Sequence, residues 1–211
     1  MVENTISGNF DTTEIEIQYV KDFLRKEGFI EGVDFTKVRK YQEADAADII
    51  VYFKNGQQLL VEVKEEKYAR FSKFGEYGID FISVFQYKNP ADAPKWCHPT
   101  SPNKLKEFCD AIVVDKPGKI TYSKSDIWLF VVKAPDGSYY HLEGYNGMKM
   151  KMIDFKQYLS ENCQFTANAK PADQMSSKDK FGSACFYIKP GKMDVFRFTK
   201  KDWSTYRTRV R

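Results

Sequence analysis

Apolar positions recur along the chain with two periods, which separate predicted helices from predicted strands. Residues 11–27 carry an apolar stripe at helical spacing, formed by Ile15, Tyr19, Val20, Phe23 and Leu24. Asp11 with Glu14 three residues later has the spacing of a capping box, and Gly28 follows as a stop signal. The pattern therefore predicts an N-terminal helix.

Beyond this helix, short apolar runs bounded by turn residues predict a series of strands. Strands are predicted at 35–41, 77–88, 110–115 and 126–132, a second helix at 152–162, and a terminal hairpin at 184–198 around Pro190-Gly191. Residues 89–108, rich in Pro, Asn and Lys, predict a surface loop or insertion, and 164–180 predict a loop. This order predicts an α/β or α+β fold with a central mixed β-sheet flanked by helices.

The segment from Asp48 to Glu66 predicts a hairpin around Asn55-Gly56. A two-residue loop would pair Lys54 with Gln57 and place Asp48 and Glu62 on opposite faces. A three-residue loop with Gly56 in the left-handed conformation pairs Phe53 with Gln57, and the position numbers of every pair then sum to 110. The second register gathers the apolar residues on one face, and for that reason we expect it.

In this register Asp48 lies across from Glu62, and Lys64 shares their face because strand side chains alternate. Cross-strand partners have Cβ atoms ~5 Å apart, so the two carboxylates would repel unless a cation lies between them. Mg²⁺ prefers such oxygen ligands, and the Val63 carbonyl adds another. The alternative is an exposed salt-bridge cluster worth under about 1 kcal/mol.

The composition is that of a chain with a substantial core. Among 211 residues, 16% are aromatic, no apolar run approaches the roughly 20 residues that span a bilayer, and no secretory signal opens the chain. We therefore expect a single domain over 1–211, with a core at about 11–162 and a C-terminal strand or hairpin extension at about 163–211. The expected location is the cytoplasm. The net charge of +4 permits an anionic partner without requiring one.

Four cysteines are spaced without a Cys-x-x-Cys pair, at Cys97, Cys109, Cys163 and Cys185. Cys97-His98 with Cys109 has the composition of half a zinc site. The alternative, free buried thiols in a reducing compartment, is favoured by the spacing.

The order of helix, strand and acid-bearing hairpin resembles the PD-(D/E)xK nuclease superfamily, whose core is a mixed sheet flanked by helices. Asp48 matches the strand-opening acid, and "VEVKEE" supplies Glu62 and Lys64. "FGEYGID", "TYSKSDIWLFVV" and "SACFYIKPGKM" are similar to stretches of a phage-like branch, so that the resemblance covers about residues 12–198. The proline that often precedes the first acid is absent. The resemblance implies a restriction-endonuclease-like core in one nuclease-like domain.

The resemblance also implies a metal-binding set. Asp48, Glu62 and the Val63 carbonyl would bind Mg²⁺, with Mn²⁺ as a substitute, and Lys64 would complete the catalytic set. Further candidate ligands are Asp80, from the branch motif, and Glu14 or Glu16, since some members bring a glutamate from the first helix. Glu14 has the competing role of a helix cap, and Asp126 is expected only to start its strand.

The segment after the hairpin combines cations with aromatic side chains. Lys67, Arg70 and Lys73 alternate with Tyr68, Phe71 and Phe74. Such mixtures suit a nucleic-acid groove, where cations contact phosphates and rings stack on bases. An ordinary helix whose aromatic residues face the core is an equal alternative. The basic C-terminus, 199–211, is either an arm that contacts phosphates or a frayed tail.

Together these features predict a Mg²⁺-dependent nuclease acting on DNA, with RNA as an alternative substrate, in a phage, mobile-element or restriction-type setting. The enzyme would hydrolyse phosphodiester bonds with one or two metal ions, as a monomer or a homodimer. Two other classes remain open: a non-catalytic nucleic-acid-binding module on the same scaffold, and an interaction protein whose aromatic surface binds another protein.

Overall fold

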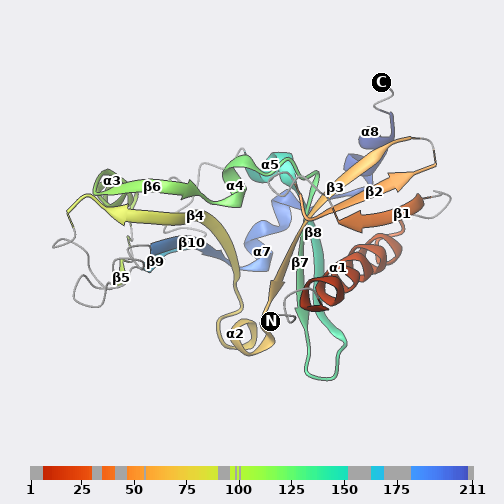
Figure 1. Ribbon diagram of the computed structural model, residues 1–211, viewed down its shortest axis with the longest axis horizontal. Coiled ribbons are helices and arrows are strands. Elements are labelled where there is room, and N and C mark those ends of the chain that lie inside the picture. Colours follow the sequence, from red (N-terminus) through yellow and green to blue (C-terminus); the bar gives the residue numbers. More distant parts are fainter. Residues whose placement is uncertain are drawn as a thin grey trace, which may run out of the picture. The chain divides into compact units, whose positions relative to one another are not determined.

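The computed structural model describes residues 7–29, 35–40, 47–54, 56–89, 96–97, 99, 101–151, 163–168 and 182–208. Contacts divide the chain into two units. The first contains Met1–Lys73, Ser123–Met150 and Val195–Arg211, and the second contains Phe74–Tyr122 and Lys151–Asp194 (Figure 1). This division differs from the single domain expected from the sequence, and its boundaries do not follow the expected one near residue 163. Each unit has its own sheet, so the fold is α+β, as predicted.

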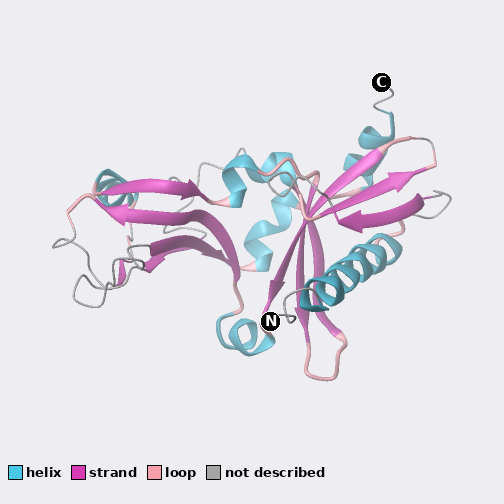
Figure 2. Ribbon diagram, in the orientation of Figure 1, coloured by secondary structure: helices cyan, strands magenta, loops and turns pink. Residues whose placement is uncertain are grey.

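The first unit is built on a five-stranded mixed sheet with the order β1-β2-β3-β7-β8. Its strands are β1 (Phe35–Lys40), β2 (Ile49–Phe53), β3 (Gln58–Glu66), β7 (Ile127–Lys133) and β8 (Tyr139–Asn146). The central pair, β3 with β7, is parallel, and the other neighbours are antiparallel. Figure 2 shows these strands in magenta. The mixed sheet predicted from the sequence is therefore confirmed.

The helix α1 (Ser7–Lys26) covers one face of this sheet and buries Tyr19, Val20, Phe23 and Leu24 against it (Figure 1). It begins four residues before Asp11, so the predicted cap and capping box are wrong, and Ile15 is 45% exposed. The C-terminal end matches the prediction. Gly28 has φ +66°, and the Phe29 N–H donates to the Leu24 carbonyl, as in a Schellman motif.

The hairpin between β2 and β3 has the predicted register. Ile49 pairs with Val61 and Tyr52 with Gln58, so the position numbers of each pair sum to 110. The turn contains the expected glycine, since Gly56 has φ +83°. The three-residue loop is confirmed by the Phe53 N–H, which donates to the Gln57 carbonyl at 3.0 Å.

The second unit contains an antiparallel sheet with the order β5-β9-β10-β4-β6. Its strands are β4 (Tyr77–Tyr87), β5 (Trp96–Cys97), β6 (Ile112–Pro117), β9 (Cys163–Asn168) and β10 (Gly182–Ile188). The helix α3 (Pro102–Asp110), capped by Ser101, packs Phe108 against Phe85 and Phe165. The short helix α4 (Lys119–Tyr122) follows β6.

Several predicted elements differ in this unit. The strand predicted at 110–115 falls largely in β6, which lies at the edge of the sheet and leaves Val113 and Val114 about half exposed. The segment 89–108 contains β5 and most of α3, so it is not simply a loop. The strand β9 lies where a loop was predicted from residue 164 onward. The predicted helix at 152–162 lies outside the described residues.

The terminal hairpin is also wrong, because β10 is followed by helices. Pro190 begins α7 (Pro190–Met193), a position that suits its fixed φ and missing N–H, and a 3₁₀ turn, η3 (Asp194–Phe196), comes next. The described part of the basic C-terminus forms the helix α8 (Lys200–Thr208). Trp203 docks this helix on the first unit by stacking on Phe29 at 5.6 Å.

No helix in the described ranges has the length and apolar character that crossing a bilayer requires.

Candidate functional site

Two aspartates hold the central strand β3 from either side. The Asp48 carboxylate, just before β2, accepts a hydrogen bond from the Val63 N–H at 2.9 Å. The Asp126 carboxylate, just before β7, accepts one from the Leu60 N–H at 2.8 Å. Asp126 thus lies at the start of its strand as expected, and its carboxylate also binds the backbone of β3. The two side chains fix β3 in the sheet.

The face of β3 turned away from α1 carries Glu62 and Lys64, while Val61 and Val63 join the core beneath the helix. The Glu62 carboxylate is almost fully buried, at 1% exposure. Lys64 keeps 23% of its side chain exposed, and its Nζ lies 3.1 Å from Glu62 Oε1. The pairing of β2 with β3 ends at Ile49 and Val61, and the Asp48 N–H donates to the Val61 carbonyl at 3.1 Å, so that Asp48 lies at the end of β2 beside the part of β3 that carries Glu62. The structure therefore places Glu62 and Lys64 together on one face, while the Asp48 carboxylate is bound to the backbone N–H of Val63, the residue between them.

Trp128 of β7 lies beside Glu62 in the parallel register and forms the wall of this site. The indole is fully buried, and the Lys64 ammonium lies 5.5 Å from the ring centroid, within the range of a cation–π contact. Among the described residues, its Nε1–H has no hydrogen-bond partner. An aromatic side chain and a carboxylate together hold the lysine in place.

The donor set fits a hard cation such as Mg²⁺ in its chemistry, because carboxylates, a backbone carbonyl and water are oxygen ligands. Within the described part of the chain, no group of three or more His, Cys, Asp or Glu side chains is placed to share a metal ion. A metal at this site would thus be held by Asp48, Glu62, the Val63 carbonyl and water.

The further candidate ligands lie elsewhere. Glu14 is exposed and Glu16 half-buried on α1, the helix that packs on the opposite face of the sheet. Asp80 lies on β4 of the second unit, where its carboxylate accepts hydrogen bonds from the Ser83 hydroxyl at 3.2 Å and the Cys185 thiol at 3.5 Å. In the described ranges none of the three completes a metal-binding group with Asp48 and Glu62.

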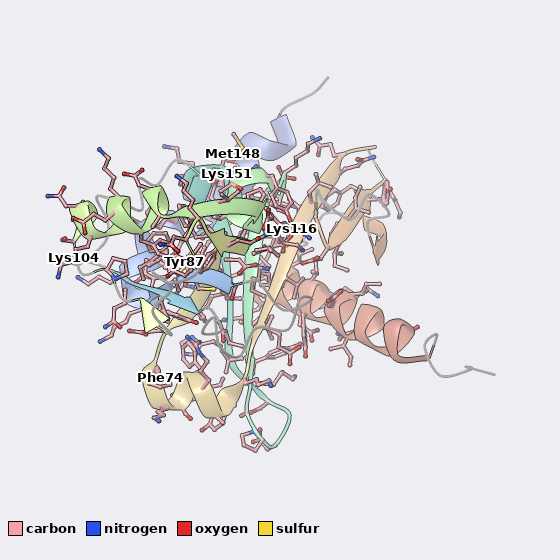
Figure 3. The ribbon with its side chains drawn as sticks, turned by 60° about the vertical axis from the view of Figure 1, so that its left-hand side comes forward. Phe74, Tyr87, Lys104, Lys116, Met148 and Lys151 are labelled. Atoms are coloured by element: carbon pink, nitrogen blue, oxygen red, sulfur yellow. The ribbon has the colours of Figure 1, made fainter. Side chains whose placement is uncertain are left out.

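The cations after β3 lie on the helix α2 (Tyr68–Phe74) and just before it. Lys67 and Lys73 are exposed, whereas the Arg70 guanidinium pairs with the Glu66 carboxylate at 2.9 Å. One of the aromatic residues on α2 faces the core, and another is exposed as a nucleic-acid contact would be. Phe71 is buried in the protein, while Phe74, labelled in Figure 3, is 52% exposed.

A second polar cluster, which the sequence did not predict, lies on β8 on the same face. Glu143 accepts hydrogen bonds from Tyr145 and from Arg197, each at 2.7 Å, and His141 Nδ1 lies 3.6 Å from it. Burial alone would raise the pKa of Glu143, but the hydrogen bonds from Tyr145 and Arg197 outweigh it and hold this pKa below its usual value. Arg197 joins residues far apart in the chain, so no local pattern could have indicated this cluster.

No protein-family model, curated protein or solved structure matches this chain. Its function must therefore be argued from its own residues.

Proposed function

We propose that the protein is a metal-dependent nuclease that hydrolyses phosphodiester bonds in DNA. One observation carries the proposal: the Asp48 carboxylate is bound to the Val63 N–H at 2.9 Å, and the two neighbours of Val63 on β3 are the buried Glu62 and Lys64, whose ammonium lies 3.1 Å from the Glu62 carboxylate. The resemblance to the PD-(D/E)xK superfamily supports the proposal. In both, a helix, a strand and an acid-bearing hairpin follow one another along the chain. Here the second strand of the hairpin, β3, then pairs in parallel with β7 in a mixed sheet.

Each residue has a defined part in the proposal. Asp48, Glu62 and the Val63 carbonyl would hold Mg²⁺ or Mn²⁺, which lowers the pKa of bound water and offsets charge on the reacting phosphate. The Val63 N–H orients the Asp48 carboxylate. Lys64 supplies a positive charge beside the phosphate as negative charge develops there. Lys67 and Lys73 would contact neighbouring phosphates of the strand.

The test is cleavage of plasmid and single-stranded DNA in Mg²⁺ or Mn²⁺. We expect Asp48→Asn, Glu62→Gln and Lys64→Ala each to lower the rate at least about a hundredfold, as the loss of a catalytic group does. Glu65→Gln is the matched control. Glu65 follows Lys64 on the same strand but faces α1, where it accepts a hydrogen bond from Tyr19 at 3.2 Å, so this variant should retain activity.

Equal cleavage by the wild type and the three site variants would remove the assignment. Salt-sensitive DNA binding without metal-dependent cutting would replace it with the non-catalytic nucleic-acid-binding module. The same assay with RNA decides between the two substrates. We also propose a cytoplasmic setting, with which Cys109 and Cys185 agree because neither forms a disulfide. Light scattering of the purified protein tests for a homodimer.

A further inference from the structure

Four aromatic rings gather where β3 runs into α2. Tyr68 and Phe71 of α2 meet Tyr140 and His141 of β8. Tyr140 lies 5.4 Å from Tyr68, 6.0 Å from Phe71 and 5.1 Å from His141, measured between ring centroids. Phe71 and His141 lie 4.7 Å apart. This group, the α2–β8 ring cluster, belongs to the first unit.

The Tyr140 side chain is exposed to solvent and is also held in place by its neighbours. Its side chain is 52% exposed, although three neighbouring rings hold it and its backbone belongs to a strand. A ring that is already held loses little conformational freedom when another flat group stacks on it, so stacking costs little entropy. Tyr140 is therefore suited to bind a planar ligand.

The charge around the ring cluster favours an anionic ligand. The segment 67–74 carries three cations and no acidic residue. Lys67 and Lys73 are exposed, and Arg70 uses its guanidinium to pair with Glu66. Aromatic rings beside exposed cations match the two parts of a nucleotide, since rings stack on the base and ammonium groups attract the phosphate.

The ring cluster lies close enough to the proposed metal site to bind the same strand. Glu66 ends β3 two residues after Lys64, and across the sheet Glu66 pairs with Val132, which pairs with His141. Two residue steps along a strand and two strand spacings place the His141 backbone about 12 Å from that of Lys64.

We propose that Tyr140 stacks on an unpaired base of the nucleic acid, whose phosphates run past Lys67 and Lys73. The substrate would then be single-stranded or locally unpaired, because the bases of an intact duplex are stacked on one another and expose no face to the ring. The inference rests on the proposed function in taking nucleic acid as the ligand, and it goes further by naming the strand form.

The experiment is fluorescence anisotropy with a labelled single-stranded oligonucleotide and with the duplex of the same sequence, both in EDTA so that no cleavage occurs. Tyr140→Leu should weaken single-strand binding by between about fivefold and a hundredfold, the usual effect of removing one stacking ring. Tyr140→Phe should bind as the wild type does. Duplex binding should be the same for all three proteins.

Met148→Ala is the matched control, because Met148 is an exposed apolar side chain of the same unit, at 61%, outside the ring cluster (Figure 3). This variant should bind both oligonucleotides like the wild type. Thermal unfolding of Tyr140→Leu verifies that the variant is folded. If the leucine variant is unstable, Tyr140→Met, which also lacks a ring, takes its place in the comparison with Tyr140→Phe.

Unchanged single-strand binding by Tyr140→Leu would overturn the inference, as would an equal loss of single-strand and duplex binding. Cleavage lost in the Asp48 and Lys64 variants, together with normal binding by Tyr140→Leu, would leave the nuclease proposal standing alone. A wild type that binds single strands through Tyr140 but never cleaves would support the inference and remove the nuclease proposal.

Discussion

Glu62 places a carboxylate in the central strand of a sheet with 1% exposure, where a valine or leucine would pack at lower cost. Burying a charge costs several kcal/mol, and attraction to one cation often does not repay it. The position is therefore poorly explained by stability alone, and such departures are typical of functional sites.

The Glu62–Lys64 pair gives a stability prediction that does not depend on activity. Lys64→Met leaves the buried carboxylate without its cation, so it should lower the free energy of unfolding by about 3 kcal/mol, measured in urea. The double variant Glu62→Met/Lys64→Met should unfold at or above the wild-type free energy. Lys67→Met, at an exposed position just beyond the strand, is the control. A double variant less stable than Lys64→Met would contradict the argument.

At the scale of elements, the hairpin that joins β2 to β3 sets the register on which the site depends. Gly56 has φ +83°, a conformation that L side chains adopt only with strain, and a Cβ added there would meet no atom within 4 Å. The backbone conformation, and not crowding, thus requires glycine.

Gly56→Ala should therefore lower the free energy of unfolding by about 1–2 kcal/mol, the cost of a left-handed alanine. Gly56→Asn should cost less, because asparagine tolerates this conformation better. Urea unfolding measures both variants, and Gly191→Ala, on α7 where φ is ordinary and space is open, is the control. Equal stability of Gly56→Ala and the wild type would argue against the three-residue turn.

The sequence predicted what local patterns determine. Alternation and Asn55-Gly56 determined the hairpin register, so the pairing of Ile49 with Val61 and the common face of Glu62 and Lys64 were predicted correctly. The hairpin predicted around Pro190-Gly191 was wrong, because the same dipeptide suits both a hairpin turn and the first turn of a helix. Trp128 and Glu143 were not assigned to the site, because strand pairs between distant segments bring them there and no short pattern records such pairing.

At the scale of the whole molecule, the first unit is made from three separate stretches of chain. The last stretch returns after the second unit and attaches to β8, where Arg197 pairs with Glu143 at 2.7 Å and the Phe198 N–H donates to the Gly144 carbonyl at 3.0 Å. Trp203 then packs on Phe29 and Phe53. These contacts attach the C-terminal stretch to the rest of the first unit.

The low pKa of Glu143 makes the attachment of the C-terminal stretch sensitive to acid. A carboxyl whose pKa is lower in the folded state stabilises the fold above its unfolded pKa, and this contribution disappears as the pH falls through the folded pKa. Arg197→Met removes one of the hydrogen bonds that lower the pKa, so acid unfolding should begin at a higher pH, measured by circular dichroism. Lys201→Met, exposed on α8, should unfold like the wild type. An unchanged acid midpoint for Arg197→Met would contradict this role.

The interleaving of the two units has a consequence for biosynthesis. The acid-bearing hairpin leaves the ribosome before the second unit, yet Trp128, which lies beside Glu62, is translated only after the first stretch of that unit, Phe74–Tyr122. A nascent chain therefore carries the acids of the site long before their surroundings exist. The proposed nuclease activity would arise only after the stretch that supplies Trp128 has been translated, and chains terminated before that stretch would not cleave nucleic acid.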